Sequence, residues 1–211
     1  MNNVDQELWT NEEFYNPFGP DLLRLKINEN VRLKLLDSIT LWLQSYEPIN
    51  IPGAAGANLK NSIVDGKMGV VSEEKLQGHT GNIIQNMLCK YGEYYYNRPC
   101  ESNIGTVWYG IMKSGDFHIL HSHCKDIDIA EVSGAIYLEV PDNLPSPQGN
   151  MNWVMGGPGQ PLYNNTYSHP PQSGDVFLWP GWLLHTVYPF RSEQERIMIS
   201  FNGQIRGELS G

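Results

Sequence analysis

The spacing of apolar residues changes from helical to extended near the middle of the chain. Leu35, Ile39 and Leu43 recur on one helical face, which predicts an amphipathic helix that starts near Asn28. A second stripe between residues 83 and 91 predicts another helix, whose first turns are interrupted by glycines. We therefore expect two helices in the first hundred residues.

Beyond Cys100 the period falls to two, and short runs rich in aromatic and β-branched residues predict strands. The predicted strands are Thr106–Lys113, Ser133–Val140, Met151–Val154, Asp175–Trp179, Leu184–Tyr188 and Arg196–Phe201. One more strand, Leu22–Ile27, is expected in an otherwise irregular arm over residues 1–28. Helices followed by many short strands predict an α+β, mainly β fold, with a sandwich or barrel in the C-terminal half.

The segment from Pro141 to Pro171 contains seven prolines and four glycines. Apart from a short strand at Met151–Val154, we expect it to be a long irregular excursion. Loops of this length in a small domain usually carry function, so the segment is a candidate lid or binding loop.

Length and composition indicate one domain. The chain has 211 residues, of which 40% are hydrophobic, which is enough for one substantial core. We predict a single domain over residues 1–211, with an arm and helices over residues 1–100 and a β core over residues 101–205.

Charge and cysteine content restrict the partners and the compartment. A net charge of −9 without a basic block disfavours binding to nucleic acid or to an anionic membrane. No apolar run approaches the roughly 18–20 residues of a membrane span, and the first residues lack signal-peptide features. Three cysteines without CxxC spacing suit reduced thiols and a cytoplasmic location.

Histidines provide the first candidate chemistry. His121 and His123 share a face if the chain is extended, so their imidazoles can share one metal ion. His118 has the opposite parity and is expected to point elsewhere. His185 follows the turn at Pro180–Gly181 and returns a third imidazole to the end of a sheet, although a buried histidine there is also compatible with plain core packing.

Arg196 opens the apolar strand that follows His185. A guanidinium that points into a β-barrel needs an anionic partner. That partner is either a buried carboxylate of the protein or the carboxylate of a ligand, bound through two hydrogen bonds.

These residues form an ordered set of motifs between residues 107 and 202. The set runs His121-x-His123, Ser133-Gly134 with Tyr137, Gly174-Asp175, His185, and Arg196 with Ser200-Phe201-Asn202. It resembles the Fe(II)- and 2-oxoglutarate-dependent oxygenases, most closely a small family with an H-x-H, H and R pattern and more distantly the prolyl hydroxylases. The resemblance implies a double-stranded β-helix, the jelly-roll or cupin-like fold, with supporting N-terminal helices.

The resemblance also implies a metal site. His121 and His185 match the two histidine ligands of Fe(II). Most of the superfamily has Asp or Glu at the position of His123, which completes a triad of two histidines and one carboxylate. The third ligand is therefore either His123 or a nearby aspartate, Asp126 or Asp128, and the spacing favours His123.

The co-substrate site follows from the same resemblance. Arg196 matches the residue that holds the distal carboxylate of 2-oxoglutarate, and Tyr137 matches a tyrosine that helps to bind it. The implied activity is hydroxylation at an unactivated C–H bond of a protein residue or small molecule, with Fe(II), 2-oxoglutarate and O2. The alternatives are a three-histidine cupin-type dioxygenase that does not use 2-oxoglutarate and a non-catalytic jelly-roll binding or structural protein.

Overall fold

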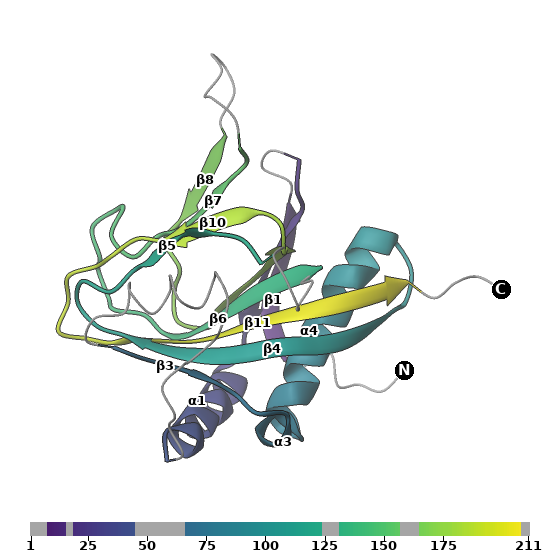
Figure 1. Ribbon diagram of the computed structural model, residues 1–211, viewed down its shortest axis with the longest axis horizontal. Coiled ribbons are helices and arrows are strands. Elements are labelled where there is room, and N and C mark those ends of the chain that lie inside the picture. The colour runs from purple at the N-terminus through teal and green to yellow at the C-terminus, as the bar shows by residue number, and fades with distance from the viewer. Residues whose placement is uncertain (1–7, 16–18, 45–65, 124–130, 157–164, 208–211) are drawn as a thin grey trace.

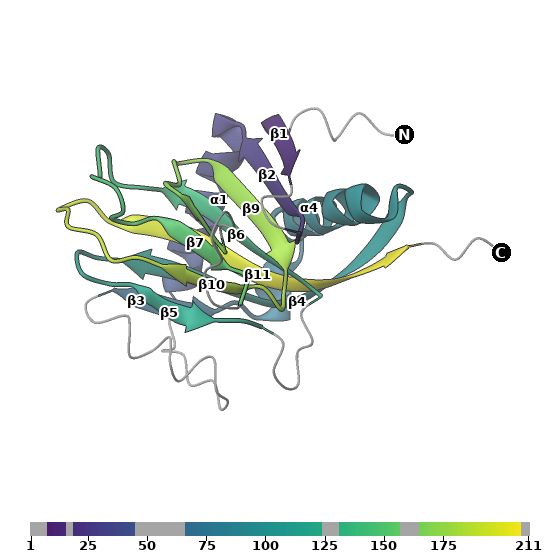
Figure 2. The same ribbon diagram turned by 90° about the horizontal axis from the view of Figure 1, so that it is seen from above.

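Two antiparallel β-sheets face each other, and helices cover the outer face of the larger sheet (Figures 1 and 2). The computed structural model describes residues 8–15, 19–44, 66–123, 131–156 and 165–207. The larger sheet has the strand order β1-β2-β9-β6-β11-β4-β3, and the smaller sheet has the order β5-β10-β7-β8. The mainly β architecture with N-terminal helices is therefore confirmed.

The strands of the larger sheet come from both halves of the chain. They are β1 (Trp9–Tyr15), β2 (Leu22–Ile27), β3 (Lys67–Val70), β4 (Cys100–Met112), β6 (Val132–Glu139), β9 (Asp175–Pro180) and β11 (Arg196–Gly207). The strands of the smaller sheet are β5 (His118–His121), β7 (Met151–Val154), β8 (Thr166–His169) and β10 (Leu184–Val187).

Three helices are described, namely α1 (Glu29–Leu43), α3 (Glu73–Leu76) and α4 (His79–Tyr96). The Asn28 side chain caps α1 by accepting a hydrogen bond from the Val31 amide, as the sequence predicts. The second apolar stripe belongs to α4, and the short α3 precedes it. Within the described ranges, no helix is long and apolar enough to cross a membrane.

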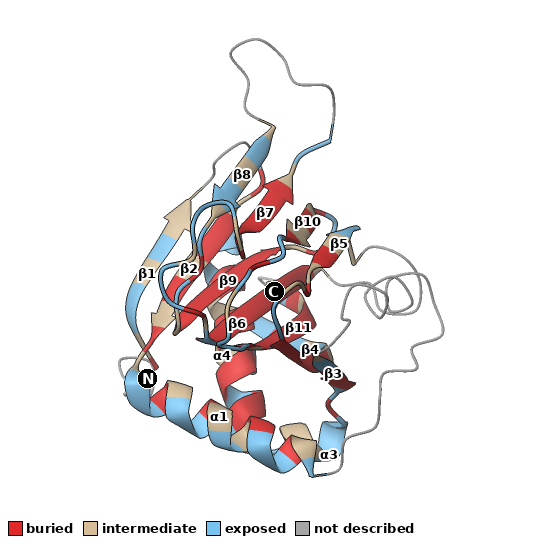
Figure 3. Cartoon of the chain, turned by 90° about the vertical axis from the view of Figure 1, so that its left-hand side faces the viewer, coloured by how far each residue is buried: buried red, intermediate tan, exposed pale blue. Residues whose placement is uncertain are grey.

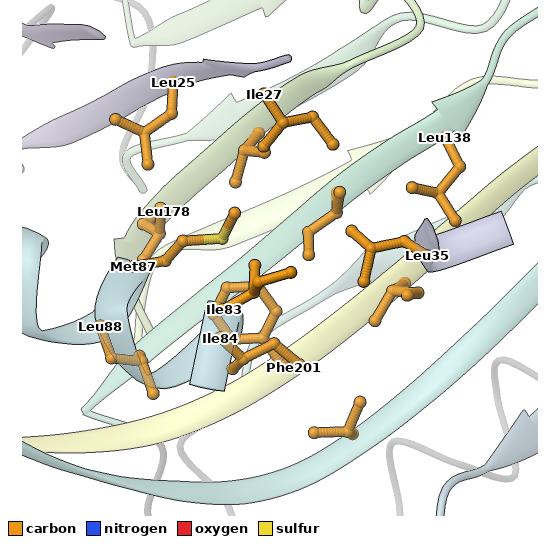
Figure 4. Packing of buried hydrophobic residues seen from close by; sticks show 14 of the residues in the cluster. Leu25, Ile27, Leu35, Ile83, Ile84, Met87, Leu88, Leu138, Leu178 and Phe201 are labelled. Atoms are coloured by element: carbon orange, nitrogen blue, oxygen red, sulfur yellow. The ribbon is translucent and has the colours of Figure 1, made fainter. Parts of the chain in front are cut away.

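The helices bury their apolar faces on the larger sheet and form one hydrophobic core with it. Leu35 of α1 and Met87 of α4 point towards the sheet, where Leu178 and Phe201 lie (Figure 4). The outward face of α1 stays exposed, while the central strands are buried (Figure 3). A second apolar cluster contains Tyr137 and Trp153, which belong to opposite sheets, so it fills the space between them.

Four strands have no counterpart in the sequence expectation. The arm contains β1 as well as β2, β3 adds an edge strand between α1 and α3, and β5 forms an edge of the smaller sheet. In the segment Pro141–Pro171, β8 pairs with the expected β7 and both extend the smaller sheet, while the other described residues form turns and irregular chain. The four unexpected strands are short or rich in polar residues, so they lack the apolar alternation that marks the central strands.

The glycine of the Ser133-Gly134 motif is required by packing within the larger sheet. Gly134 lies opposite Phe201 in the register of β6 and β11. A Cβ atom on Gly134 would lie 2.2 Å from the Phe201 ring. Because Phe201 is fully buried, its ring has little room to move away.

We expect Gly134→Ala to lower the free energy of unfolding by about 1–3 kcal/mol, the usual effect of overpacking a core. Gly156→Ala is the matched control, because no atom lies within 4 Å of the added methyl group. Urea unfolding of both variants measures the difference. Equal stabilities would contradict the packing explanation.

Candidate active site

A cluster of three imidazoles lies at the ends of β5 and β10. The two strands are antiparallel and place His185 directly opposite His121. His123 follows two residues after β5, and its backbone amide donates to the Gly181 carbonyl at 2.9 Å. The turn between β9 and β10 therefore holds both His123 and His185. One ligand atom from each imidazole lies within 4.8 Å of the others, which is close enough to bind a single metal ion.

Hydrogen bonds fix which ring nitrogen is available on two of these histidines. The Nδ1 atom of His121 lies 2.7 Å from the Ile119 carbonyl, and that of His185 lies 2.9 Å from the Leu183 carbonyl. A carbonyl oxygen only accepts, so both Nδ1 atoms carry the proton. The Nε2 lone pairs of the neutral rings are then free to coordinate a metal.

His123 is held from a different direction. Its Nδ1 lies 3.4 Å from the side-chain amide of Asn202, and its Nε2 lies 3.3 Å from the Nε2 of His185. The Ser133 hydroxyl donates to Oδ1 of Asn202 at 3.0 Å. A hydroxyl can also accept a hydrogen bond, so the Asn202 amide can flip and direct its oxygen towards Nδ1 of His123. Nδ1 then carries the proton, and Nε2 is free to coordinate a metal.

Burial keeps these imidazoles neutral. Loss of solvation lowers the pKa of His121, lowers that of His185 well below its usual range and lowers that of His123 to about 3. Repulsion from His121 adds to the shift at His123 and His185. Neutral imidazole is the form that binds metal, so all three side chains are in the metal-binding form at neutral pH.

Arg196 and Tyr137 meet between the two sheets. Both side chains are fully buried, and the guanidinium carbon lies 5.7 Å from the Tyr137 ring and 5.0 Å from the Phe190 ring. One Arg196 nitrogen donates to the Gly149 carbonyl at 2.7 Å. A Cβ atom on Gly149 would lie 2.2 Å from that guanidinium, and its φ of +69° also favours glycine.

The guanidinium has unused hydrogen-bonding capacity. Its Nε and Nη1 atoms are buried without a partner, as is the Tyr137 hydroxyl. Within the described ranges, no carboxylate forms an ion pair with Arg196. Burial lowers the pKa of Arg196 and raises that of Tyr137 to about 12. The pair therefore offers several donors to an anion.

His118 does not point away from this region, contrary to the parity argument. A β-bulge lies between the pairs His185–His121 and Val187–His118, so three positions of β5 span two positions of β10. The bulge turns His118 to the inner face, where it is 5% exposed and its ring centre lies 6.2 Å from that of His121.

The alternative metal ligands, Asp126 and Asp128, lie outside the described residues.

The comparisons with known proteins agree with this arrangement. Residues 106–202 match the family described as "Putative 2OG-Fe(II) oxygenase", and no curated protein sequence matches the chain significantly. The match indicates a 2OG-Fe(II) oxygenase, an oxidoreductase, and it agrees with the Fe(II), 2-oxoglutarate and O2 predicted from the sequence.

Solved structures share the fold of this oxygenase at low sequence identity. A prolyl hydroxylase from Trichoplax adhaerens, solved with a hypoxia-inducible factor peptide, has a TM-score of 0.60 and 15% identity, with 95% of this chain and 84% of that chain covered. A Pseudomonas putida prolyl-4-hydroxylase has a TM-score of 0.52 and 14% identity, covering 84% and 86%. HygX from Streptomyces hygroscopicus, solved with nickel and 2-oxoglutarate, has a TM-score of 0.59 and 12% identity, covering 86% and 81%.

Apolar side chains surround the polar groups of the oxygenase. Phe177, Trp179 and Met198 belong to the buried cluster that also contains Tyr137, and the Trp179 ring centre lies 4.8 Å from that of His185. Trp108 lies beside His123, with ring centres 5.4 Å apart. These apolar side chains therefore line the interior around the imidazoles and Tyr137.

The sequence pattern gave no role to Ser133 or Asn202, although both stand in the quoted motifs. They meet because Ser133 lies opposite Asn202 in the pairing of β6 with β11. Only the register of that pairing reveals the contact.

The depressed pKa values predict that acid destabilises the metal-free oxygenase. Burial, then His121 and Arg196, lower the pKa of His118 to about 3, whereas the unfolded chain takes up that proton near pH 6.5. Stability is therefore complete above about pH 6.5 and falls as the pH drops towards about 3. Between about pH 7 and about pH 5, His118 alone should cost about 2 kcal/mol of unfolding free energy.

His118→Gln should remove this contribution and flatten the pH dependence by that amount. Urea unfolding with a chelator at the two pH values measures it. An unchanged pH dependence would mean that His118 titrates normally in the folded protein.

Proposed function

We propose that the protein is an Fe(II)- and 2-oxoglutarate-dependent hydroxylase built on a double-stranded β-helix. In this proposal His121, His123 and His185 bind the iron, and Arg196 with Tyr137 binds the distal carboxylate of 2-oxoglutarate. Residues 1–211 form one domain, in which residues 101–205 provide the jelly-roll core and the N-terminal helices support it.

The observation that carries the proposal is the buried, unpaired guanidinium of Arg196. Burying a charge without a partner is costly, so proteins pair such groups or reserve them for a ligand. The hydrogen bond to Gly149 satisfies only one nitrogen, and the two others face no carboxylate of the described chain. A dicarboxylate co-substrate supplies the missing anion, which favours this function over a cupin-type dioxygenase without 2-oxoglutarate.

The imidazole cluster suits Fe(II). Imidazole nitrogens are common ligands of iron, and three protein ligands leave coordination positions for small molecules. When bound, Fe(II) would couple oxidative decarboxylation of 2-oxoglutarate by O2 to oxidation of a substrate C–H bond. The protein's own part is to keep three imidazoles neutral and convergent, to hold the dicarboxylate through Arg196, and to exclude water with the aromatic walls around Trp179.

We assign the third ligand to His123 because its neighbours provide what an imidazole ligand needs. A metal-binding histidine normally has its second nitrogen held by another group. Asn202, itself held by Ser133, is placed to do this for His123. If Asp126 or Asp128 were the third ligand, the contact of Asn202 with the His123 ring would not serve metal binding.

Two substrate classes are compatible with this site, namely an amino-acid residue in a peptide and a free small molecule. The Trichoplax enzyme of the same fold was solved with a peptide, which supports the first possibility. We propose that the reacting group is an unactivated C–H bond in either case.

Arg196→Ala should weaken 2-oxoglutarate binding about 30-fold to several-thousand-fold, because a desolvated carboxylate loses its charged partner at a cost of roughly 2–5 kcal/mol. Arg196→Lys should weaken it less, since it keeps the charge but not the planar fork. Tyr137→Phe should cost only about 0.5–1.5 kcal/mol. Calorimetry with Mn(II) in place of Fe(II) measures each affinity.

Arg191→Ala is the matched control, because it removes the same charge from an exposed position five residues before Arg196. Thermal melts exclude unfolding. If folded Arg196→Ala binds 2-oxoglutarate as tightly as wild type, the carboxylate assignment is wrong. If wild type does not bind 2-oxoglutarate, the cupin or binding-module alternative replaces the proposal.

Asn202→Ala should weaken Mn(II) binding by about 10- to 100-fold, the usual effect of losing the group that holds a metal-binding histidine. His123→Asp restores a carboxylate ligand, so adding Asn202→Ala to that variant should have a much smaller effect on Mn(II) affinity. Titrations of the four proteins form a double-mutant cycle. Additive effects would show that Asn202 does not act through His123.

A further inference from the structure

His118 is a buried polar residue that the proposed function does not use. Its side chain is 5% exposed, and its Nε2 atom has no hydrogen-bond partner. Leaving a buried donor unpaired costs about 1–3 kcal/mol, so such groups in folded proteins usually have a function or a ligand. The bulge in β5 that turns His118 inward has the same implication, because bulges often redirect side chains next to active sites.

Most of the unpaired buried polar atoms in the described chain come from one region. Besides Nε2 of His118, they include two nitrogens of Arg196, the Tyr137 hydroxyl and the indole nitrogens of Trp153 and Trp179. Tyr137, Trp153 and Trp179 belong to the apolar cluster between the two sheets, and Arg196 contacts Phe190 of that cluster. His118 therefore shares its surroundings with the groups proposed to bind the dicarboxylate.

The strand geometry places His118 on the way from the imidazole cluster to Arg196. Along β10 the chain passes from His185, opposite His121, to Val187, opposite His118. It then reaches Phe190, whose ring packs against the Arg196 guanidinium at 5.0 Å. His118 therefore lies next to His121 and pairs with the strand that leads from the imidazole cluster towards Phe190.

The chemical state of His118 suits a hydrogen-bond donor rather than a second cation. Burial is the main reason that its pKa falls to about 3, and the positive charge of Arg196 contributes. A neutral imidazole can carry its proton on Nε2 and donate it to a carboxylate oxygen.

We propose that Nε2 of His118 donates a hydrogen bond to the distal carboxylate of bound 2-oxoglutarate, beside Arg196 and Tyr137. This inference rests on the proposed function. The proposed hydrogen bond makes His118 a third binding residue for the co-substrate. It also explains the β-bulge in β5, which the spacing of the histidines did not predict.

The test is calorimetric titration of the Mn(II)-loaded protein with 2-oxoglutarate and with 2-oxopentanoate, which has a methyl group in place of the distal carboxylate. His118→Leu should weaken 2-oxoglutarate binding by about 10- to 100-fold, the range for one hydrogen bond to a charged group. It should leave 2-oxopentanoate affinity and Mn(II) affinity unchanged. His118→Gln, which keeps an N–H donor, should recover most of the loss.

His79→Leu is the control, because His79 is an exposed histidine at the start of α4. Equal 2-oxoglutarate affinities for wild type and His118→Leu would overturn the inference. So would an equal loss for both keto acids, or a loss of Mn(II) binding, since either would place the effect at the metal end. If wild type itself fails to bind 2-oxoglutarate, the proposed function is what fails.

A second measurement does not depend on the folding of a variant. In wild-type protein loaded with diamagnetic Zn(II), the Nε2–H resonance of His118 should move downfield when 2-oxoglutarate is added and stay in place with 2-oxopentanoate. The same response to both ligands, or none to either, would contradict the hydrogen bond.

Discussion

The interior of this protein is organised around a buried guanidinium that pairs with no carboxylate among the described residues. Arg196 sits at the start of β11, in the middle of the larger sheet, and its charge cannot reach water. Gly149 approaches it without a side chain, Phe190 covers one side, and Tyr137 adds an unpaired hydroxyl. Such an arrangement lowers the stability of the free protein and becomes favourable when an anion completes it.

The imidazole cluster depends on the smaller sheet. The pairing of β5 with β10 brings His121 to His185, and the turn after β9 fixes His123 through its backbone. Each imidazole is oriented by a second group, two of them by carbonyl oxygens and the third by the Asn202 amide. The larger sheet, supported by the helices, therefore carries Arg196 and Tyr137, while the smaller sheet and its adjoining turn carry the imidazoles.

Much of this could be predicted from the sequence, because it depends on local periodicity. The central strands alternate clearly, α1 has its Asn28 cap, and the spacing of His121 and His123 places both at one site. What the sequence could not provide is register. The bulge in β5 reverses the expected direction of His118, and the contact of Ser133 with Asn202 exists only because β6 pairs with β11 at one offset. The strands β1, β3, β5 and β8 were missed because short or polar strands carry little periodic signal.

The most direct test of the account is the visible absorption of the protein with Fe(II) and 2-oxoglutarate under anaerobic conditions. A keto acid that chelates Fe(II) gives a weak charge-transfer band, so the account predicts that the band appears with wild type. The band should be lost in His185→Ala, which removes a ligand, and should need far more 2-oxoglutarate in Arg196→Ala. Wild-type protein that binds Fe(II) but never develops the band at saturating 2-oxoglutarate would contradict it.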